Sequence, residues 1–278
     1  MEWSRAKSIL IILFAFLNIF LLVSILRTES RSRPGSEYIK HVKNYLESRN
    51  IKIECKIPSY CSDSGSVVYK DENMDETVIA KYFLGDDAEA EAGSDDGRIW
   101  RDEGKALEIG NNKIVFRNSS PDGILDIGDK NAVEKELKKV FSGIGISFRD
   151  YAVDVWRNEN GLLHVRYVKK YRGHMLFDIY ADFIVSGRGI EYAEIIPGDV
   201  NYTLAENEIL SAWNILAVAG IRENSVISDM SFGYKRINEG ELYDSPVWRI
   251  RFSDGTEVFY NAYTGEEIAS EKAQASII

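Results

Sequence analysis

The residues best suited to catalysis are few and lie far apart along this 278-residue chain. Its three histidines, His41, His164 and His174, fall in different predicted elements, and His174 lies at the turn of a predicted hairpin. A hydrolase needs an activated nucleophile or a metal ion, and the chain contains no HExxH, GxSxG, phosphate-binding-loop or dinucleotide-binding motif. We therefore expect no catalytic residues, no metal site and no cofactor, and we expect the protein not to be an enzyme.

Cys55 and Cys61 are the only cysteines, and five residues separate them. If this part of the chain lies outside the cell, a disulfide between them closes a small loop and adds about 2–3 kcal/mol of stability. The alternative is a pair of reduced, partly buried thiols. A zinc site is not expected here, because zinc takes four ligands and no histidine lies nearby in sequence.

Acidic residues outnumber basic ones, 44 to 34, which gives a formal net charge of −10. Nucleic acids and anionic lipid headgroups bind surfaces rich in lysine and arginine, so we expect no nucleic-acid partner. The most acidic stretch, residues 86–96, lacks the alternating ligands and the terminal glutamate of a calcium loop. We expect a solvated loop there.

An apolar run covers residues 8–26 and is bracketed by Lys7 and Arg27. As a helix it measures about 28 Å, close to the hydrocarbon thickness of a bilayer. It is longer than the core of a cleaved signal peptide, and no small residues form a cleavage site after it, so we expect a retained transmembrane helix. Helices with a short basic N-terminal flank usually insert with that flank inside. Residues 1–7 are then cytoplasmic and residues 27–278 extracytoplasmic, in a single-pass protein of the cell membrane.

Asn18 is the notable polar residue of this run and lies near its middle. In lipid, an amide can bond across an interface between two helices, where apolar burial contributes little. Apolar residues at helical spacing share or flank its face, and with it they form a predicted partner-contact stripe: Phe14, Leu17, Asn18, Leu21 and Ile25. The alternative is that a strongly apolar span simply tolerates one asparagine.

Beyond a polar linker at residues 27–35, hydrophobic spacing predicts helices at residues 36–49, 129–142 and 203–219. The last of these begins with a capping box, formed by Thr203 with Glu206. Alternating or β-branched runs predict strands at residues 51–54, 66–69, 77–83, 113–117, 151–156, 162–171, 175–185, 227–236, 247–252 and 257–263.

The order of one helix followed by antiparallel strands recurs along the chain. This recurrence predicts an α+β ectodomain of repeated helix-and-antiparallel-sheet units, in which each helix covers one face of a sheet. We expect a first lobe at residues 36–127 and a second lobe, with two such units, at residues 128–278. The apolar faces predict a buried set: Val133, Leu137, Phe141, Phe177, Phe183, Trp213, Leu216 and Trp248.

Both ends of the chain resemble one known family. Residues 1–9, MEWSRAKSI, running into residues 16–21, FLNIFL, closely resemble the opening of the YycI family. Residues 246–250, PVWRI, and residues 260–266, YNAYTGE, resemble its closing segment. The length and the single N-terminal apolar run also fit this family, whereas the sister family YycH is longer.

The resemblance implies a membrane-anchored accessory protein of a two-component system in low-GC Gram-positive bacteria. Such proteins join a YycH-like partner and a cell-wall-sensing histidine kinase in a membrane complex, partly through transmembrane helices, and adjust the kinase. Separately, residues 167–189 and the Tyr-Thr-Gly at residues 263–265 look like modules of PepSY and protease-propeptide type. An alternative function is therefore an extracytoplasmic ligand-binding module or a propeptide-like peptidase inhibitor.

Overall fold

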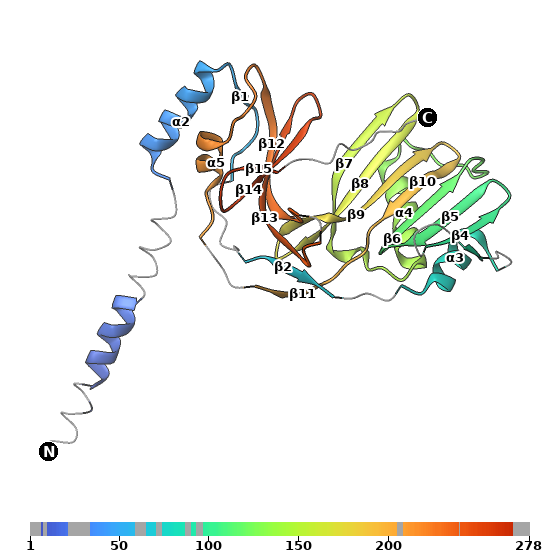
Figure 1. Cartoon of the computed structure of the whole chain (residues 1–278), viewed down its shortest axis with the longest axis horizontal. Helices are drawn as coiled ribbons and strands as arrows, with labels where there is room; N and C mark the ends of the chain where they lie inside the picture. The colour runs from blue at the N-terminus through green and yellow to red at the C-terminus, as the bar shows by residue number, and fades with distance from the viewer. Residues whose placement is uncertain are drawn as a thin grey trace. The chain divides into compact units, whose positions relative to one another are not determined.

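The computed structural model shows a mixed α+β protein whose strands pair mainly in antiparallel fashion (Figure 1). It has two compact units, each built from separate segments of the chain. The first unit comprises residues 1–64, 207–231 and 248–278, and the second comprises residues 65–206 and 232–247. The structure describes residues 7, 10–21, 34–58, 65–70, 74–86, 90–92, 97–204, 208–238 and 240–268.

The second unit contains a wide antiparallel sheet in the order β7-β8-β9-β10-β6-β5-β4-β3. Two-residue turns join β4 to β5, β5 to β6, β7 to β8, β8 to β9 and β9 to β10. Asn160 and Gly161 between β7 and β8 have φ of 54° and 82°, which suits a tight hairpin turn. The strands are β3 (Ala90–Ala92), β4 (Arg98–Asp102), β5 (Lys105–Gly110), β6 (Lys113–Asn118), β7 (Tyr151–Glu159), β8 (Leu162–Tyr171), β9 (His174–Ser186) and β10 (Gly189–Ile195).

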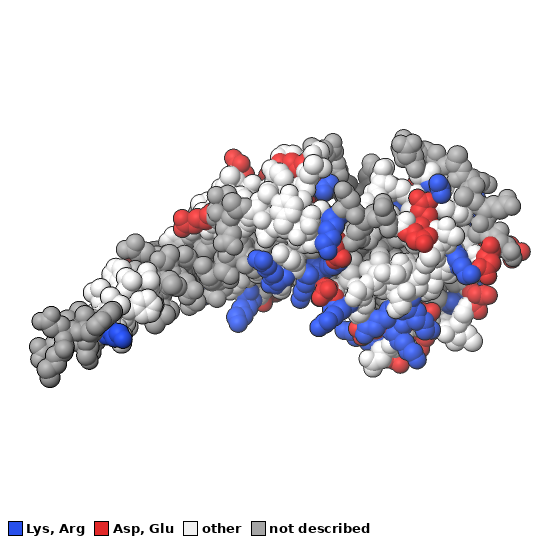
Figure 2. All heavy atoms as spheres, turned by 90° about the horizontal axis from the view of Figure 1, so that it is seen from below, with Lys and Arg blue, Asp and Glu red and all other residues white. Residues whose placement is uncertain are grey.

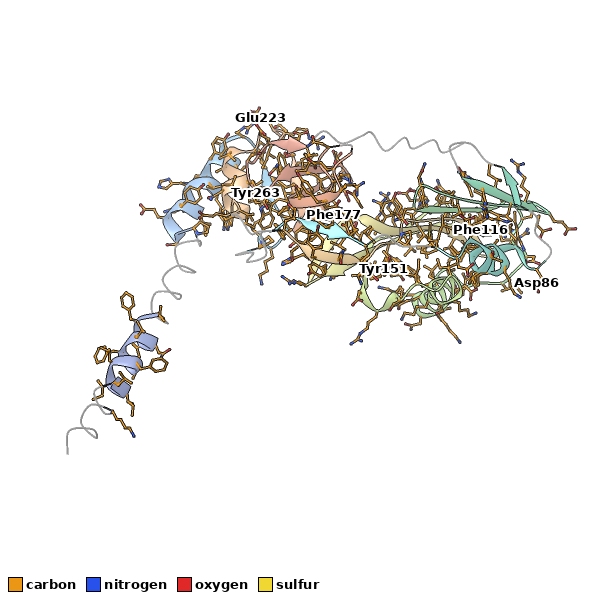
Figure 3. All side chains as sticks on the ribbon, turned by 60° about the horizontal axis from the view of Figure 1, so that its bottom comes forward. Asp86, Phe116, Tyr151, Phe177, Glu223 and Tyr263 are labelled. Atoms are coloured by element: carbon orange, nitrogen blue, oxygen red, sulfur yellow. The ribbon has the colours of Figure 1, made fainter. Side chains whose placement is uncertain are left out.

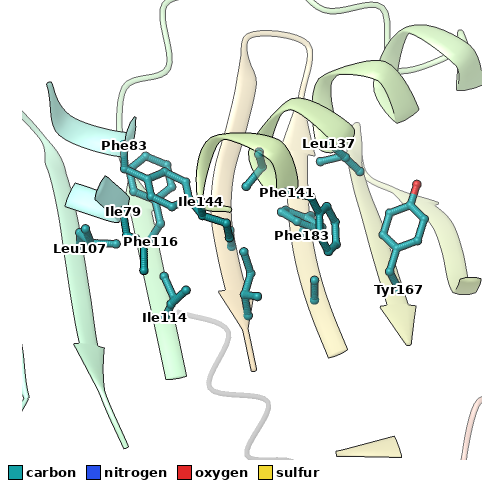
Figure 4. Close-up of a cluster of buried hydrophobic side chains, with 14 of the residues drawn as sticks. Ile79, Phe83, Leu107, Ile114, Phe116, Leu137, Phe141, Ile144, Tyr167 and Phe183 are labelled. Atoms are coloured by element: carbon teal, nitrogen blue, oxygen red, sulfur yellow. The ribbon is translucent and has the colours of Figure 1, made fainter. Parts of the chain in front are cut away.

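The core of this unit lies between the sheet and helix α4 (Lys130–Gly143), with η1 (Phe148–Asp150) beside it. Asp129 starts α4 by accepting a hydrogen bond from the amide of Asn131 at 2.9 Å. Figure 4 shows Leu137 and Phe141 of α4 directed toward the strands that carry Tyr167 and Phe183. The helix therefore covers one face of the sheet, as its apolar spacing predicts.

Residues 77–83, predicted as a strand, instead form most of helix α3 (Glu76–Leu84), so that prediction was wrong. The run Thr77-Val78-Ile79 is β-branched and favours a strand. However, the side chain of Asp75 caps the helix by accepting from the amides of Thr77 and Val78, and Ile79, Ala80, Phe83 and Leu84 are buried in the core. Capping and burial thus override local preference.

Two short strands complete the second unit. Strand β2 (Val67–Tyr69) pairs in antiparallel fashion with β11 (Val200–Thr203) and with the first residues of β13 (Tyr243–Phe252). The later residues of β12 (Val226–Lys235) pair in parallel with β9. Both β12 and β13 contribute residues to each unit.

The first unit contains helices α2 (Ser36–Ser48) and α5 (Ala212–Val218), which contact each other. Strand β1 (Lys52–Ile53) pairs in parallel with β12, while β14 (Glu257–Asn261) pairs with β13 and β15 (Glu267–Ile268). Trp248 of β13 is 1% exposed, and its indole nitrogen donates to the carbonyl oxygen of Leu210 at 2.9 Å. The predicted helix at residues 36–49 and the burial of Trp213, Leu216 and Trp248 are confirmed.

The helix predicted at residues 203–219 is much shorter in the structure, where α5 begins after Ser211. The hydroxyl of Ser211 accepts from the amide of Asn214 at 3.2 Å and caps the helix. Thr203 belongs to β11 and pairs with Val67, and Glu206 lies outside the described residues. The prediction of a capping box at Thr203 was therefore wrong, because strand pairing takes that residue instead.

Other predictions from the sequence are confirmed. Helix α4 lies within one residue of the predicted bounds 129–142, and strand β9 alternates between buried and half-buried residues from Phe177 to Ser186. The predicted burial of Val133, Leu137, Phe141, Phe177 and Phe183 is also confirmed. The division into lobes at residues 36–127 and 128–278 stays a prediction.

Near the N-terminus, residues 10–21 are helical. Residues 8, 9 and 22–26 of the predicted span lie outside the described residues. Within the part of the chain that is described, no helix combines the length and the apolar character needed to cross a membrane.

Candidate functional site

The predicted partner-contact stripe lies on the helical residues 10–21, whose side chains extend outward from the helix (Figure 3). No charged residue occurs in this segment, and Figure 2 shows the helix white on the face in view. Phe14, Leu17 and Leu21 are 67%, 52% and 48% exposed. Ile25, the remaining apolar member of the stripe, lies outside the described residues.

Asn18 lies one helical turn from both Phe14 and Leu21, so the three share a face. Its side-chain amide donates a hydrogen bond to the carbonyl oxygen of Phe14 at 2.8 Å. This bond uses one of the two amide hydrogens, and the side chain can also donate through the second hydrogen and accept through its oxygen. The arrangement offers an apolar surface with one polar group that can both donate and accept.

The histidines do not converge on a site. His41 on α2 is exposed, His164 on β8 faces Arg157 and Ile184 on the flanking strands, and His174 packs edge-on to Phe232 with ring centroids 5.0 Å apart. Among the described residues no group of three histidine, cysteine, aspartate or glutamate side chains is placed to hold a metal ion.

Cys55 lies just after β1 and is half-buried, and burial followed by the charge of Asp229 raises the pKa of its thiol. It lines a groove of about 510 Å³ in the first unit, whose walls come from α2, the chain around β1, and α5. Cys61 lies outside the described residues, so the predicted disulfide stays a prediction. A raised pKa favours the thiol over the reactive thiolate.

The sheet of the second unit carries an ordered polar network on the face opposite α4. Arg166 of β8 binds Asp182 of β9 through two parallel hydrogen bonds, at 2.8 Å and 2.6 Å, and its guanidinium lies over the ring of Tyr180 at 4.6 Å. Burial raises the pKa of Asp182 and outweighs the opposing effect of Arg166. These side chains hold one another in place on a half-buried surface.

Glu194 of β10 joins the same network. Its two carboxylate oxygens accept from the hydroxyls of Tyr180 and Tyr192, each at 2.6 Å, and Lys113 lies 2.9 Å away. Burial acts to raise the pKa of Glu194, but these three donors outweigh it and lower the pKa. No local pattern in the sequence marks this network, because its members meet only through the register of four strands.

Taken together, these features define a class of protein: an α+β domain structure preceded by an apolar helix with an exposed, polar-centred stripe. The sequence matches the family model described as YycI protein over residues 30–263. The chain therefore belongs to the YycI family. This is a family of accessory regulators of a two-component system rather than of enzymes, and its members are generally membrane-associated. None of the curated proteins matches the chain in sequence.

Solved structures with a similar fold include an uncharacterized protein from Eubacterium rectale ATCC 33656. It shares 16% sequence identity, with a TM-score of 0.52 over 80% of this chain and 91% of that one. The C-terminal domain of Bacillus megaterium YpeB shares 9% identity, with a TM-score of 0.42 over 72% of this chain and 97% of that domain. At such identity the Eubacterium protein supports the fold alone.

Proposed function

We propose that this chain is a non-enzymatic accessory regulator of a cell-wall-sensing two-component histidine kinase, acting in a membrane complex with a YycH-like protein. The observation that carries the proposal is the family match over residues 30–263. That match extends across both compact units, so the regulatory assignment covers the folded part of the chain as a whole.

The proposal places the protein in the cell membrane. Residues 8–26 form the single membrane span, residues 1–7 are cytoplasmic, and the two compact units are extracytoplasmic. Support comes from the length and apolar character of the run and from the helical state of residues 10–21. Protease added to intact protoplasts should then digest the units, and full protection of them would contradict this orientation.

The proposal also gives the helix a part in partner binding. An amide in the hydrocarbon region is costly without partners, and Asn18 retains bonding capacity after its bond to Phe14. A polar contact between membrane helices contributes about 0.6–2 kcal/mol, a factor of about 3 to 30 in affinity. The stripe centred on Asn18 is therefore the surface we assign to a helix of the kinase or of the YycH-like protein.

Co-purification of the intact chain from its own membrane tests both levels of the proposal. The unchanged protein should bring down a histidine kinase and a YycH-like protein, and recovery of neither would contradict the regulatory assignment. Asn18→Leu should lower that recovery several-fold, while Asn18→Gln, which keeps the amide, should preserve it. Phe20→Leu is the matched control, because Phe20 is 66% exposed and lies on the other side of the helix from Asn18. Equal recovery of the partners with Asn18→Leu and Phe20→Leu would show that the stripe centred on Asn18 is not the contact site.

A further inference from the structure

A buried carboxylate lies in the second unit where β13 pairs with β2. The side chain of Asp244 is 0% exposed, and its Oδ2 accepts a hydrogen bond from the hydroxyl of Tyr69 at 2.5 Å. Its Oδ1 is also buried and has no hydrogen-bond partner among the described residues. The guanidinium of Arg236 comes within 3.7 Å of that oxygen, at a distance too long for a hydrogen bond.

A second carboxylate competes for the neighbouring cations. Asp178 of β9 accepts from the ammonium of Lys235 at 2.5 Å and from the backbone amide of Arg236 at 2.7 Å. Asp178 is half-buried, so solvent also screens its charge. Asp244 therefore has one good hydrogen bond, a distant cation and a like charge nearby, which is an unfavourable setting for a buried anion.

The acid–base behaviour of the cluster agrees with this geometry. Burial, followed by the charge of Asp178, raises the pKa of Asp244 to about 7, although the bond from Tyr69 and the charges of Arg236 and Lys235 act to lower it. Burial and the two carboxylates raise the pKa of Tyr69, so its hydroxyl stays a hydrogen-bond donor. Asp244 therefore exchanges its proton near neutral pH.

We propose that Asp244 is an internal proton-binding site that makes the pairing of β2 with β13 depend on pH. With the proton bound, the side chain is neutral, and Oδ1 can carry the hydrogen while Oδ2 keeps its bond from Tyr69. Without the proton, the buried carboxylate of Asp244 is negatively charged and lies near the like charge of Asp178. Strand β2 has only three residues, so opening it is an accessible way to bring that charge to water.

The direction of the effect follows from linkage. The folded chain binds the proton more tightly than an exposed aspartate does, so closure of β2 is favoured at low pH and weakens as pH rises toward 7. If Asp244 has an ordinary pKa when β2 is open, opening increases on the order of 30-fold between pH 5.5 and pH 8. Above that range the closed and open forms bind protons alike, and the effect levels off.

Hydrogen exchange of the intact chain in detergent, followed by mass spectrometry, tests the proposal. Protection factors, which already correct for intrinsic exchange rates, should fall by about 30-fold in peptides covering β2 and β11 between pH 5.5 and pH 8. Asp244→Asn should remove this dependence, and Asp122→Asn, an exposed aspartate of the same unit, should leave it unchanged. Unchanged protection in the original protein, or the same fall in Asp244→Asn, would overturn the proposal.

A second variant keeps the test decisive if Asp244→Asn does not fold. Tyr69→Phe removes a hydrogen bond that favours the charged carboxylate, so the midpoint of the protection change should move to higher pH. An unmoved midpoint would show that another group carries the dependence and would also overturn the proposal.

Discussion

Phe141 is the best place to test the packing of the second unit, because four aromatic rings surround it. Its side chain is 0% exposed, and its ring centroid lies 4.8 Å from that of Tyr151, 5.1 Å from that of Phe148, and 6.0 Å from those of Tyr167 and Phe183. These rings come from α4, η1, β7, β8 and β9, so the residue ties the helix to the sheet.

Replacing Phe141 with alanine removes the ring and leaves a cavity. Such truncations of buried phenylalanine cost about 3–5 kcal/mol, and aromatic pairs contribute about 0.5–1.5 kcal/mol each beyond their buried area. Because the surrounding rings are held by separate elements, they cannot collapse far into the space. We therefore expect a loss near the upper end of that range, about 4–5 kcal/mol of unfolding free energy.

Urea denaturation of the intact chain in a mild detergent measures this loss. At each urea concentration a short protease pulse cleaves only unfolded molecules, so cleavage within α4 and β8 gives the unfolded fraction. Lys135→Ala on the exposed side of the same helix is the matched control and should change stability by about 0.5 kcal/mol or less. A loss below about 1.5 kcal/mol for Phe141→Ala would refute the assignment of this residue to a tightly packed centre.

Three further predictions concern separate parts of the chain. Glu194→Ala should lower the unfolding free energy of the second unit by about 1–3 kcal/mol, because two tyrosine hydroxyls and an ammonium lose their acceptor; urea denaturation measures it, and a neutral effect would contradict the network. Gly233→Ala should destabilise the pairing of β12 with β9, because a Cβ there overlaps the carbonyl oxygen of Met175. Urea denaturation should show a lower unfolding midpoint, and an unchanged midpoint would contradict the close approach of the two strands. Asp244→Asn should make stability of the second unit less dependent on pH between 5.5 and 8, since the raised pKa makes the original protein lose stability as pH rises; equal dependence in both proteins would argue against it.

The parts of the fold that were predictable from the sequence have strong local signals. In α4, the Asp129 cap and the spacing of Val133, Leu137 and Phe141 agree with each other, so both the helix and its buried face followed from the sequence. Strand β9 alternates between buried and half-buried residues from Phe177 to Ser186, and Phe177 and Phe183 on its inward face are buried as predicted. When capping, spacing and propensity all point the same way, tertiary contacts have nothing to override.

The errors occurred where local signals conflict with packing. Residues 77–79 favour a strand by their β-branching, yet the Asp75 cap and the core position of Ile79 make a helix. Thr203 precedes a glutamate three residues on, which is typical of a helix start, yet its pairing with Val67 places it in β11. Such pairings join residues more than a hundred positions apart, and no local pattern records them.

The polar clusters were beyond sequence reasoning for a related reason. Glu194 and Asp244 are two of 44 acidic residues, and nothing in their immediate neighbours marks them. Their environments come from strands that meet only after folding: Glu194 gains its tyrosines through the register of β9 and β10, and Asp244 gains Tyr69 through the register of β13 and β2. The stripe around Asn18 is different, because a single helix defines it, and its spacing can be read directly from the chain.

The central claim is that residues 8–26 do more than hold the protein in the membrane. The most direct measurement replaces this segment with an unrelated apolar helix of equal length and records the phosphorylation state of the kinase's response regulator in cells. Surface protease accessibility of the two units serves as the control for folding and export. The account predicts that the exchanged protein is exported and folded but no longer adjusts the kinase. Normal kinase control by the exchanged protein would contradict this prediction and would locate the contact surface in the two compact units.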